Sequence, residues 1–71
     1  MKIEFPILEI GSVGVEVYIM QALLKYWNYN ISLTGAFDTA TFLVLKAFRT
    51  DHYLTGDTVC DSLTWKALFN Y

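Results

Sequence analysis

Cys60 is the only cysteine in this 71-residue chain, and this most constrains how the chain can fold. Small domains often use disulfides or a structural metal to offset the entropy lost on folding, about 1.5 kcal/mol per residue. One cysteine forms no internal disulfide, and one Cys with one His, His52, is too few for a structural zinc site. Burial of apolar side chains must therefore stabilise the chain, which we interpret as one domain over residues 1–71.

The composition supplies that apolar material and excludes several partners. Hydrophobic residues make up 55% of the chain and charged residues 17%, against about 25% in an average soluble domain. The mean hydropathy is +0.37, and the net charge is −2. The few basic residues are scattered, which argues against nucleic acid, and no apolar run approaches the roughly 18 residues of a membrane span. The N-terminus has no signal-peptide pattern. If the protein acts outside a cell, we expect that an export signal was removed, lies on a parent chain or is not used.

Apolar periodicity predicts three short helices, over residues 15–27, 39–51 and 62–69, after an extended lead-in at residues 1–10. Ser12, Asp38 and Asp61 are the expected N-terminal caps. Such short helices are stable only when packed together, so the expected fold is all-α, a small three-helix bundle with short connecting turns. The residues expected on the helix faces are Val17, Met20, Gln21, Leu24, Thr41, Val44, Leu45, Phe48, Trp65 and Leu68.

An internal repeat supports this division of the chain. Residues 34–41 align with residues 57–64 at a spacing of 23. Each copy has a turn, an apolar plug (Phe37 or Cys60), an aspartate cap and a threonine three residues after the cap. We interpret the repeat as one device used twice, a tight connection that fills the core and starts a helix.

Three segments resemble, in order, the motifs of the type 1 peptidoglycan-binding domain family. Residues 11–24 follow its opening G-x-x-G-x-x-V-x-x-L-Q-x-x-L pattern, residues 34–49 its D-G-x-F-G-x-x-T segment and A-F-Q helix end, and residues 52–65 its last segment. The chain departs from the motifs at Thr34, Asp38, Arg49, Thr58 and Asp61. The resemblance covers about residues 8–69.

This resemblance implies a PGBD-like, three-helix module without catalytic activity that attaches wall-modifying enzymes to peptidoglycan. The implied ligand is a glycan–peptide of the wall, and the implied location is the cell wall, outside the cell, if the module is attached to or acts with an exported enzyme. The implied protein partner is a parent amidase, transpeptidase or protease domain. The alternative is a protein-interaction domain that kept the fold without the wall ligand.

Aromatic residues exceed what so small a core can hold, and several lie beside polar side chains. Flat rings next to hydrogen-bonding groups suit sugar faces and peptides. Two other roles stay open for these rings, sealing the core at the end of the first helix and contacting another protein. The candidate ligand-binding residues are Tyr26, Tyr29, Asn30, Thr34, Tyr53 and Asp57.

Catalytic interpretations are weaker. Cys60, His52 and an aspartate, Asp57 or Asp61, would be the elements of a nucleophile triad, but Cys60 occupies a plug position and is expected to be a buried hydrophobe. Gln21 falls on an apolar helix face, so we expect it to be a structural tie to loop backbone. We therefore expect no catalysis, metal or cofactor.

Overall fold

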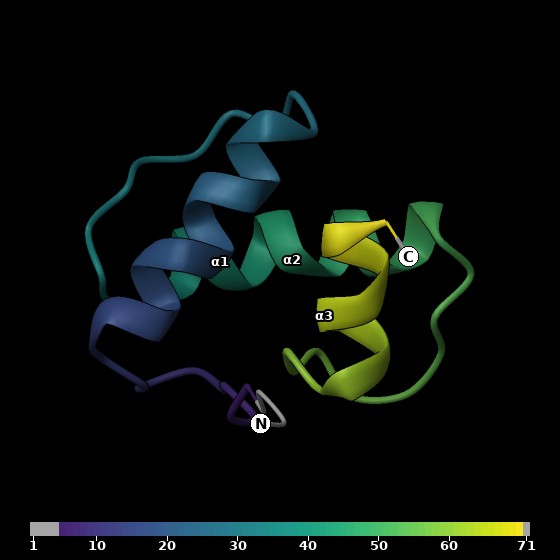
Figure 1. Ribbon diagram of the computed structural model, residues 1–71, viewed down its shortest axis with the longest axis horizontal. Coiled ribbons are helices and arrows are strands. Elements are labelled where there is room, and N and C mark those ends of the chain that lie inside the picture. The colour runs from purple at the N-terminus through teal and green to yellow at the C-terminus, as the bar shows by residue number, and fades with distance from the viewer. Residues whose placement is uncertain (1–4, 71) are drawn as a thin grey trace, which may run out of the picture.

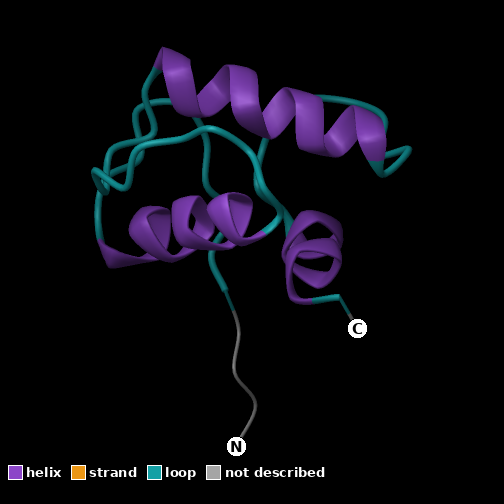
Figure 2. Ribbon diagram, turned by 90° about the horizontal axis from the view of Figure 1, so that it is seen from above, coloured by secondary structure: helices purple, strands orange, loops and turns teal. Residues whose placement is uncertain are grey.

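The protein is described by a computed structural model, which covers residues 5–70. It contains three helices, α1 (Val15–Tyr26), α2 (Thr39–Asp51) and α3 (Ser62–Phe69). Figure 1 shows α1 and α3 in front of α2, which crosses behind them, and Figure 2 shows both on the same side of α2. No strand occurs within residues 5–70, so the predicted all-α three-helix fold is confirmed.

The helix boundaries agree with the sequence prediction, except that α1 ends at Tyr26, one residue early. Asp38 and Asp61 cap α2 and α3 as expected. Their carboxylates accept hydrogen bonds from the backbone N–H of Thr41 at 2.9 Å and of Thr64 at 3.0 Å. These bonds satisfy amides that have no partner inside the helix.

The predicted cap of α1 is wrong. Gly14, not Ser12, is the N-cap residue, and no side chain caps this helix. The chain enters α1 with φ of 137° at Gly14, a conformation that favours glycine. Ser12 instead closes the preceding turn, where its Oγ accepts from the N–H of Glu9 at 3.1 Å.

One apolar cluster forms the core and draws on all three helices and the connections between them. The plug prediction is confirmed, since Phe37 and Cys60 are both buried in it. Val44 was expected in the core but is only half-buried and packs against its edge. The buried apolar residues are Leu8, Val17, Met20, Leu24, Ile31, Phe37, Leu45, Phe48, Cys60, Trp65 and Leu68.

The segment before α1 joins the two repeats. Leu8 and Cys60 exchange backbone hydrogen bonds of 3.0 and 2.8 Å, and the N–H of Phe37 donates to the Ser12 carbonyl at 2.8 Å. Further upstream, Phe5 stacks on Trp65 with ring centroids 4.6 Å apart. Residues 5–14 therefore pack into the domain and hold both plug residues in place; residues 1–4 of the expected lead-in lie outside the described part.

Candidate ligand-binding surface

Gln21 shapes the loop between α1 and α2. Its Nε2 donates to the Ala36 carbonyl and to Thr41 Oγ1, both at 3.0 Å. Its Oε1 accepts from the N–H groups of Thr34 and Gly35 at 2.8 and 2.9 Å. The fully buried amide is thus satisfied by loop atoms and by Thr41 in the first turn of α2, which confirms the predicted structural tie.

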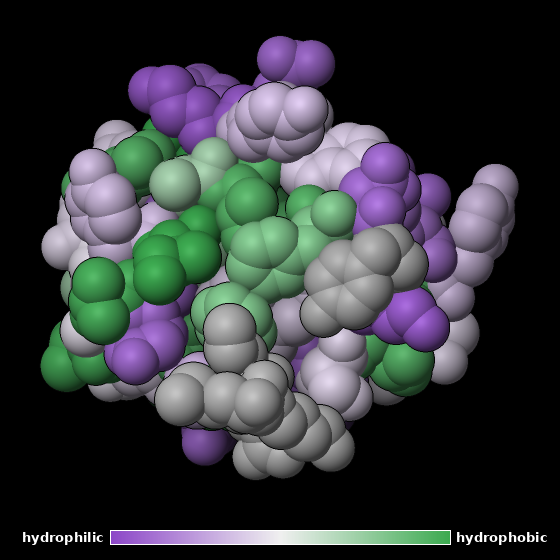
Figure 3. Space-filling model, in the orientation of Figure 1, coloured by the Kyte–Doolittle hydropathy of each residue, from purple (hydrophilic) through white to green (hydrophobic). Residues whose placement is uncertain are grey.

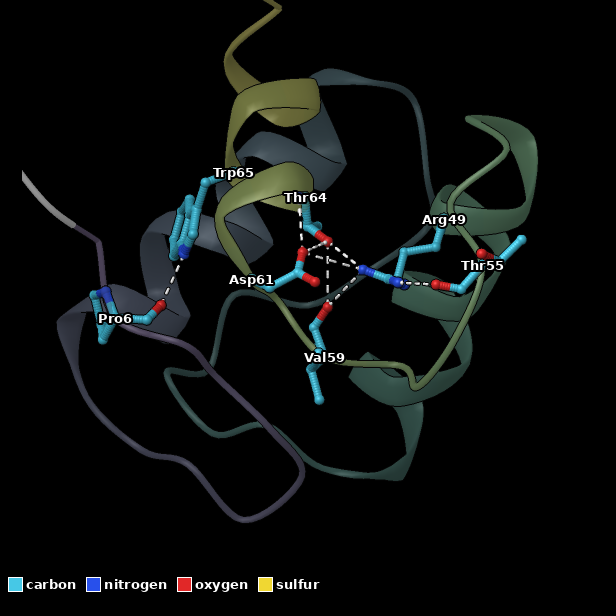
Figure 4. A network of polar contacts seen from close by, with 7 residues as sticks. All are labelled: Pro6, Arg49, Thr55, Val59, Asp61, Thr64 and Trp65. Atoms are coloured by element: carbon cyan, nitrogen blue, oxygen red, sulfur yellow. Dashed lines mark hydrogen bonds and ion pairs between the residues drawn. The ribbon is translucent and has the colours of Figure 1, made fainter.

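Arg49 has the same role in the second repeat and extends from α2 into the loop before α3 (Figure 4). Its Nη1 donates to the Val59 carbonyl at 3.0 Å and to Thr64 Oγ1, the counterparts of Ala36 and Thr41. Its Nη2 donates to the Thr55 carbonyl at 2.9 Å. This role of Arg49, a departure from the family motif, was not predicted, although Arg49 lies four residues after Leu45 on the buried face of α2.

The guanidinium of Arg49 also forms an ion pair with Asp61 at 3.3 Å. Burial favours the neutral form of Asp61, but hydrogen bonds from Thr64 and the charge of Arg49 outweigh it and lower the pKa of this carboxyl. Hydrogen bonds from Thr41 lower the pKa of Asp38 in the same way. Both caps are therefore anionic near neutral pH.

A polar hollow of about 340 Å³ lies where the loop after α1 meets the start of α2. Its polar groups are the amide of Asn30, the hydroxyls of Ser32 and Thr34, and the Asp38 carboxylate. We call it the polar hollow; its lining residues are Asn30, Ile31, Ser32, Thr34, Asp38, Ala40, Thr41 and Val44.

Two further hollows lie elsewhere. The apolar hollow, about 480 Å³, lies between the C-terminal ends of α1 and α3, and its lining residues are Leu23, Tyr26, Trp27, Leu68, Phe69 and Asn70. The Tyr53 hollow, about 500 Å³, lies after α2, and its lining residues are Thr50, Tyr53, Leu54, Thr55 and Gly56.

The six predicted binding residues do not form one site. Asn30 and Thr34 share the polar hollow, whereas Tyr26 lines the apolar hollow and Tyr53 its own. Asp57 is exposed and lines none of the three. Ser32 and Ala40 also line the polar hollow but were not predicted, because nothing in their local pattern distinguishes them from other surface residues.

Tyr29 helps to seal the core. Its ring packs edge-on against Phe48, with centroids 5.9 Å apart, and its hydroxyl donates to Asp51. Burial, together with Asp51, raises the pKa of Tyr29 to about 12. Trp27 also seals this end, with its Nε1 donating to the Leu68 carbonyl at 2.9 Å, while Tyr26 is 80% exposed. The sealing alternative thus describes Trp27 and Tyr29 but not Tyr26.

Two residues of the suggested nucleophile triad, Cys60 and His52, pack in or against the apolar core. Cys60 is fully buried, and burial raises the pKa of its thiol, which disfavours the nucleophilic thiolate. His52 stacks on Phe48 with ring centroids 4.0 Å apart. Within residues 5–70, no group of three His, Cys, Asp or Glu side chains is placed to hold a metal ion, and no helix is long and apolar enough to cross a membrane.

Apolar residues cross the face formed by α1 and α3. Figure 3 shows apolar residues gathered in a band across the middle of this face, with hydrophilic residues mainly above and to the right. Large hydrophobic side chains that are well exposed on the molecule include Ile7, Ile10, Val13, Val15, Leu43 and Leu63.

Three short packed helices with surface hollows between their connecting turns make up a small helical domain. Residues 13–68 match the family described as "Putative peptidoglycan binding domain". Because this match covers most of the sequence, the chain belongs to the peptidoglycan-binding domain family. No curated protein sequence matches it.

Two solved structures have a similar fold. A peptidoglycan-binding protein from Clostridioides difficile, in complex with glutamine hydroxamate, superposes with a TM-score of 0.86 and 25% identity. That match covers 90% of this chain but 40% of the C. difficile chain. The SleB N-terminal domain superposes with a TM-score of 0.87 and 24% identity over 97% of this chain and 96% of its own, a likeness of fold.

Proposed function

We propose that this domain is a non-catalytic module that binds a glycan–peptide of the cell wall through the polar hollow and holds a wall-modifying enzyme there. The polar hollow carries this proposal. The amide of Asn30 and the hydroxyl of Ser32 offer donors and acceptors, and Ile31 and Val44 offer apolar contact. The hydroxyl of Thr34 also lines the hollow but already bonds Gln21 and Ala36. Sugars and peptides present both kinds of surface.

The charge of the domain favours a binding mode based on hydrogen bonds and apolar contact. A net charge of −2 does not attract anionic wall polymers, and Asp38 is engaged as a helix cap. We therefore expect the affinity to be modest, on the order of micromolar to millimolar, and to change little with salt.

Sedimentation with purified insoluble peptidoglycan tests the proposal. Ala40 lines the polar hollow and is exposed, so Ala40→Trp should fill the hollow and weaken binding by about tenfold or more. Ala47→Trp is the matched control, because Ala47 is also exposed on α2 but does not line this hollow. If the wild-type domain sediments no better than an unrelated acidic protein of similar size, at both low and high salt, the proposal is wrong.

The enzyme partner is supported by a comparison of lengths. This fold accounts for 40% of the C. difficile chain, so further polypeptide accompanies it there. We infer a similar arrangement in the cell wall, with the domain carrying an amidase, transpeptidase or protease. A fluorescent protein fused to the domain should decorate isolated bacterial walls, and the Ala40→Trp fusion should not.

The apolar band over α1 and α3 favours a second candidate function, binding to another protein. Val15 is 65% exposed at the start of α1. If the domain associates with itself or with a wall enzyme through the exposed apolar residues at the start of α1, Val15→Lys should abolish the association and leave sedimentation with walls unchanged.

A further inference from the structure

Tyr53 has an unusual backbone conformation. Its φ is 59°, in the left-handed region, where β-carbon contacts disfavour most residues. Asn28 and Asn70 are the other non-glycine residues with positive φ among the described residues, and asparagine tolerates this region well. Tyr53 follows the C-cap of α2, at the position where helices usually place glycine.

The Tyr53 side chain does not offset this cost by packing. It is 92% exposed, and it has no side-chain hydrogen bond or ring contact with any residue in the described part of the chain. Tyr29, by contrast, seals the core with its ring and bonds Asp51 through its hydroxyl. The conformation of Tyr53 itself closes the C-terminus of α2, where the N–H groups of Tyr53 and Leu54 donate to the carbonyls of Thr50 and Arg49 at 3.1 and 2.8 Å. Glycine adopts this conformation at a lower cost, so packing gives no reason for a tyrosine here, and costly backbone conformations of this kind are often found at functional sites.

Arg49 holds the turn that carries Tyr53. Its carbonyl accepts from the Leu54 N–H at 2.8 Å, and its Nη2 donates to the Thr55 carbonyl at 2.9 Å. Arg49 is itself only 4% exposed and is fixed by Val59 and Thr64. The exposed ring therefore projects from a turn that is restrained on both sides, which lowers the entropy cost of binding.

The Tyr53 hollow has the chemistry to receive a neutral sugar. Its walls combine the Tyr53 ring and Leu54 with the hydroxyl-bearing residues Thr50 and Thr55, and none of its lining residues is charged. An aromatic face suits the C–H face of a sugar ring, and hydroxyls suit its edge.

We propose that Tyr53 stacks on a sugar ring of the peptidoglycan glycan and forms a second subsite, separate from the polar hollow. This inference rests on the proposed wall-binding function. The backbone of Tyr53 is strained in the free domain, so replacing Tyr53 with glycine or asparagine, which tolerate this conformation, should stabilise the fold while weakening binding.

The test compares Tyr53→Gly, Tyr53→Asn and Tyr53→Phe by sedimentation with peptidoglycan and by titration with soluble N-acetylglucosamine oligomers. Gly and Asn relieve the left-handed strain, so both variants should melt higher, by about 2–6 °C for Gly, yet bind about three- to tenfold more weakly. Tyr53→Phe keeps the ring and should bind within about twofold of wild type. Tyr18→Ala removes a tyrosine that is 47% exposed on α1, away from both subsites, and should bind as wild type does.

The outcomes separate this inference from the proposed function. If wild type and Ala47→Trp bind walls and Tyr53→Gly binds equally well, the Tyr53 subsite is wrong and the polar hollow stands. If Tyr53→Gly instead abolishes self-association of the domain without changing binding to walls or oligomers, the ring is a contact between copies and the sugar subsite is wrong. If wild type does not bind walls, the proposed function fails first and the subsite fails with it.

Discussion

Single residues with buried polar groups organise both connecting loops. Gln21 and Arg49 bond equivalent carbonyls, those of Ala36 and Val59, and equivalent threonines in the two repeats. The two residues differ in charge, however, and Arg49 has the partly buried carboxylate of Asp61 beside it. A guanidinium can serve several acceptors at once, which a lysine ammonium cannot do in the same geometry.

Removal of Arg49 should therefore be costly. Arg49→Ala leaves Asp61 without its ion partner and the Thr55 carbonyl without its side-chain donor, and it removes one of the two donors to the Val59 carbonyl, so we expect a loss of about 3–5 kcal/mol in unfolding free energy. Arg49→Gln should cost less, because its amide can satisfy part of the network. Urea denaturation measures both, with the exposed Lys46→Ala as a control within about 0.5 kcal/mol of wild type. Equal stability of Arg49→Ala and wild type would contradict the proposed role of the side chain.

Acid should destabilise the domain through its two caps. The pKa values of Asp38 and Asp61 are lowered from 3.8, so the folded state binds fewer protons than the unfolded state as the pH falls. Their contribution is fully present above the ordinary value and is lost as the pH falls through the lower folded values. Melting temperatures measured from pH 7 to pH 2 should decline mainly below about pH 5. Asp61→Asn cannot titrate, and the decline should be shallower in that variant.

At the scale of whole elements, the three helices begin in two different ways. Side-chain caps start α2 and α3, whereas a glycine with positive φ starts α1. The glycine entry lets the chain approach the first repeat closely, where the N–H of Gly14 donates to the Gly35 carbonyl at 2.9 Å. The start of α1 is therefore stabilised by a long-range contact rather than by its own sequence.

Asp38→Ala should destabilise the start of α2 by about 0.5–2 kcal/mol, because the Thr41 N–H loses its acceptor. Thermal unfolding followed by circular dichroism gives the change. Thr39→Ala, at the exposed first position of α2, should leave the melting temperature nearly unchanged. A drop as large in Thr39→Ala as in Asp38→Ala would show that the effect is not one of capping.

At the scale of the whole molecule, Trp65 joins the segment before α1 to α3. Its Nε1 donates to the Pro6 carbonyl at 2.8 Å (Figure 4), and its ring stacks on Phe5. The indole is 3% exposed and belongs to the single core cluster. In a domain of 8.2 kDa there is no second core to compensate for its loss.

Trp65→Ala should therefore cost about 3–5 kcal/mol, close to the total stability expected of so small a domain. Chemical denaturation followed by far-ultraviolet circular dichroism measures this loss. Leu63→Ala is the matched control on α3, because Leu63 is 61% exposed. A folded Trp65→Ala variant with an unchanged melting temperature would contradict the single-core description.

Local pattern was enough to predict the helices, the two aspartate caps, the plug residues and the buried Gln21. Helical periodicity, and a cap whose acceptor lies three residues from its donor, are properties of neighbouring residues, so they can be recognised in the sequence. The number of tyrosines in so small a chain also predicted that some rings would lie outside the core, but it did not predict which ones.

The roles of individual surface and buried polar residues could not be predicted in this way. Tyr29 is packed because it contacts residues distant in sequence, Asp51 and Phe48. Tyr26 and Tyr53 are exposed. Arg49 is buried because the loop before α3 folds back over it, and Gly14 replaces Ser12 as the cap because of its bond to Gly35. These arrangements depend on the free energy of long-range packing, which outweighs local preference wherever the two compete.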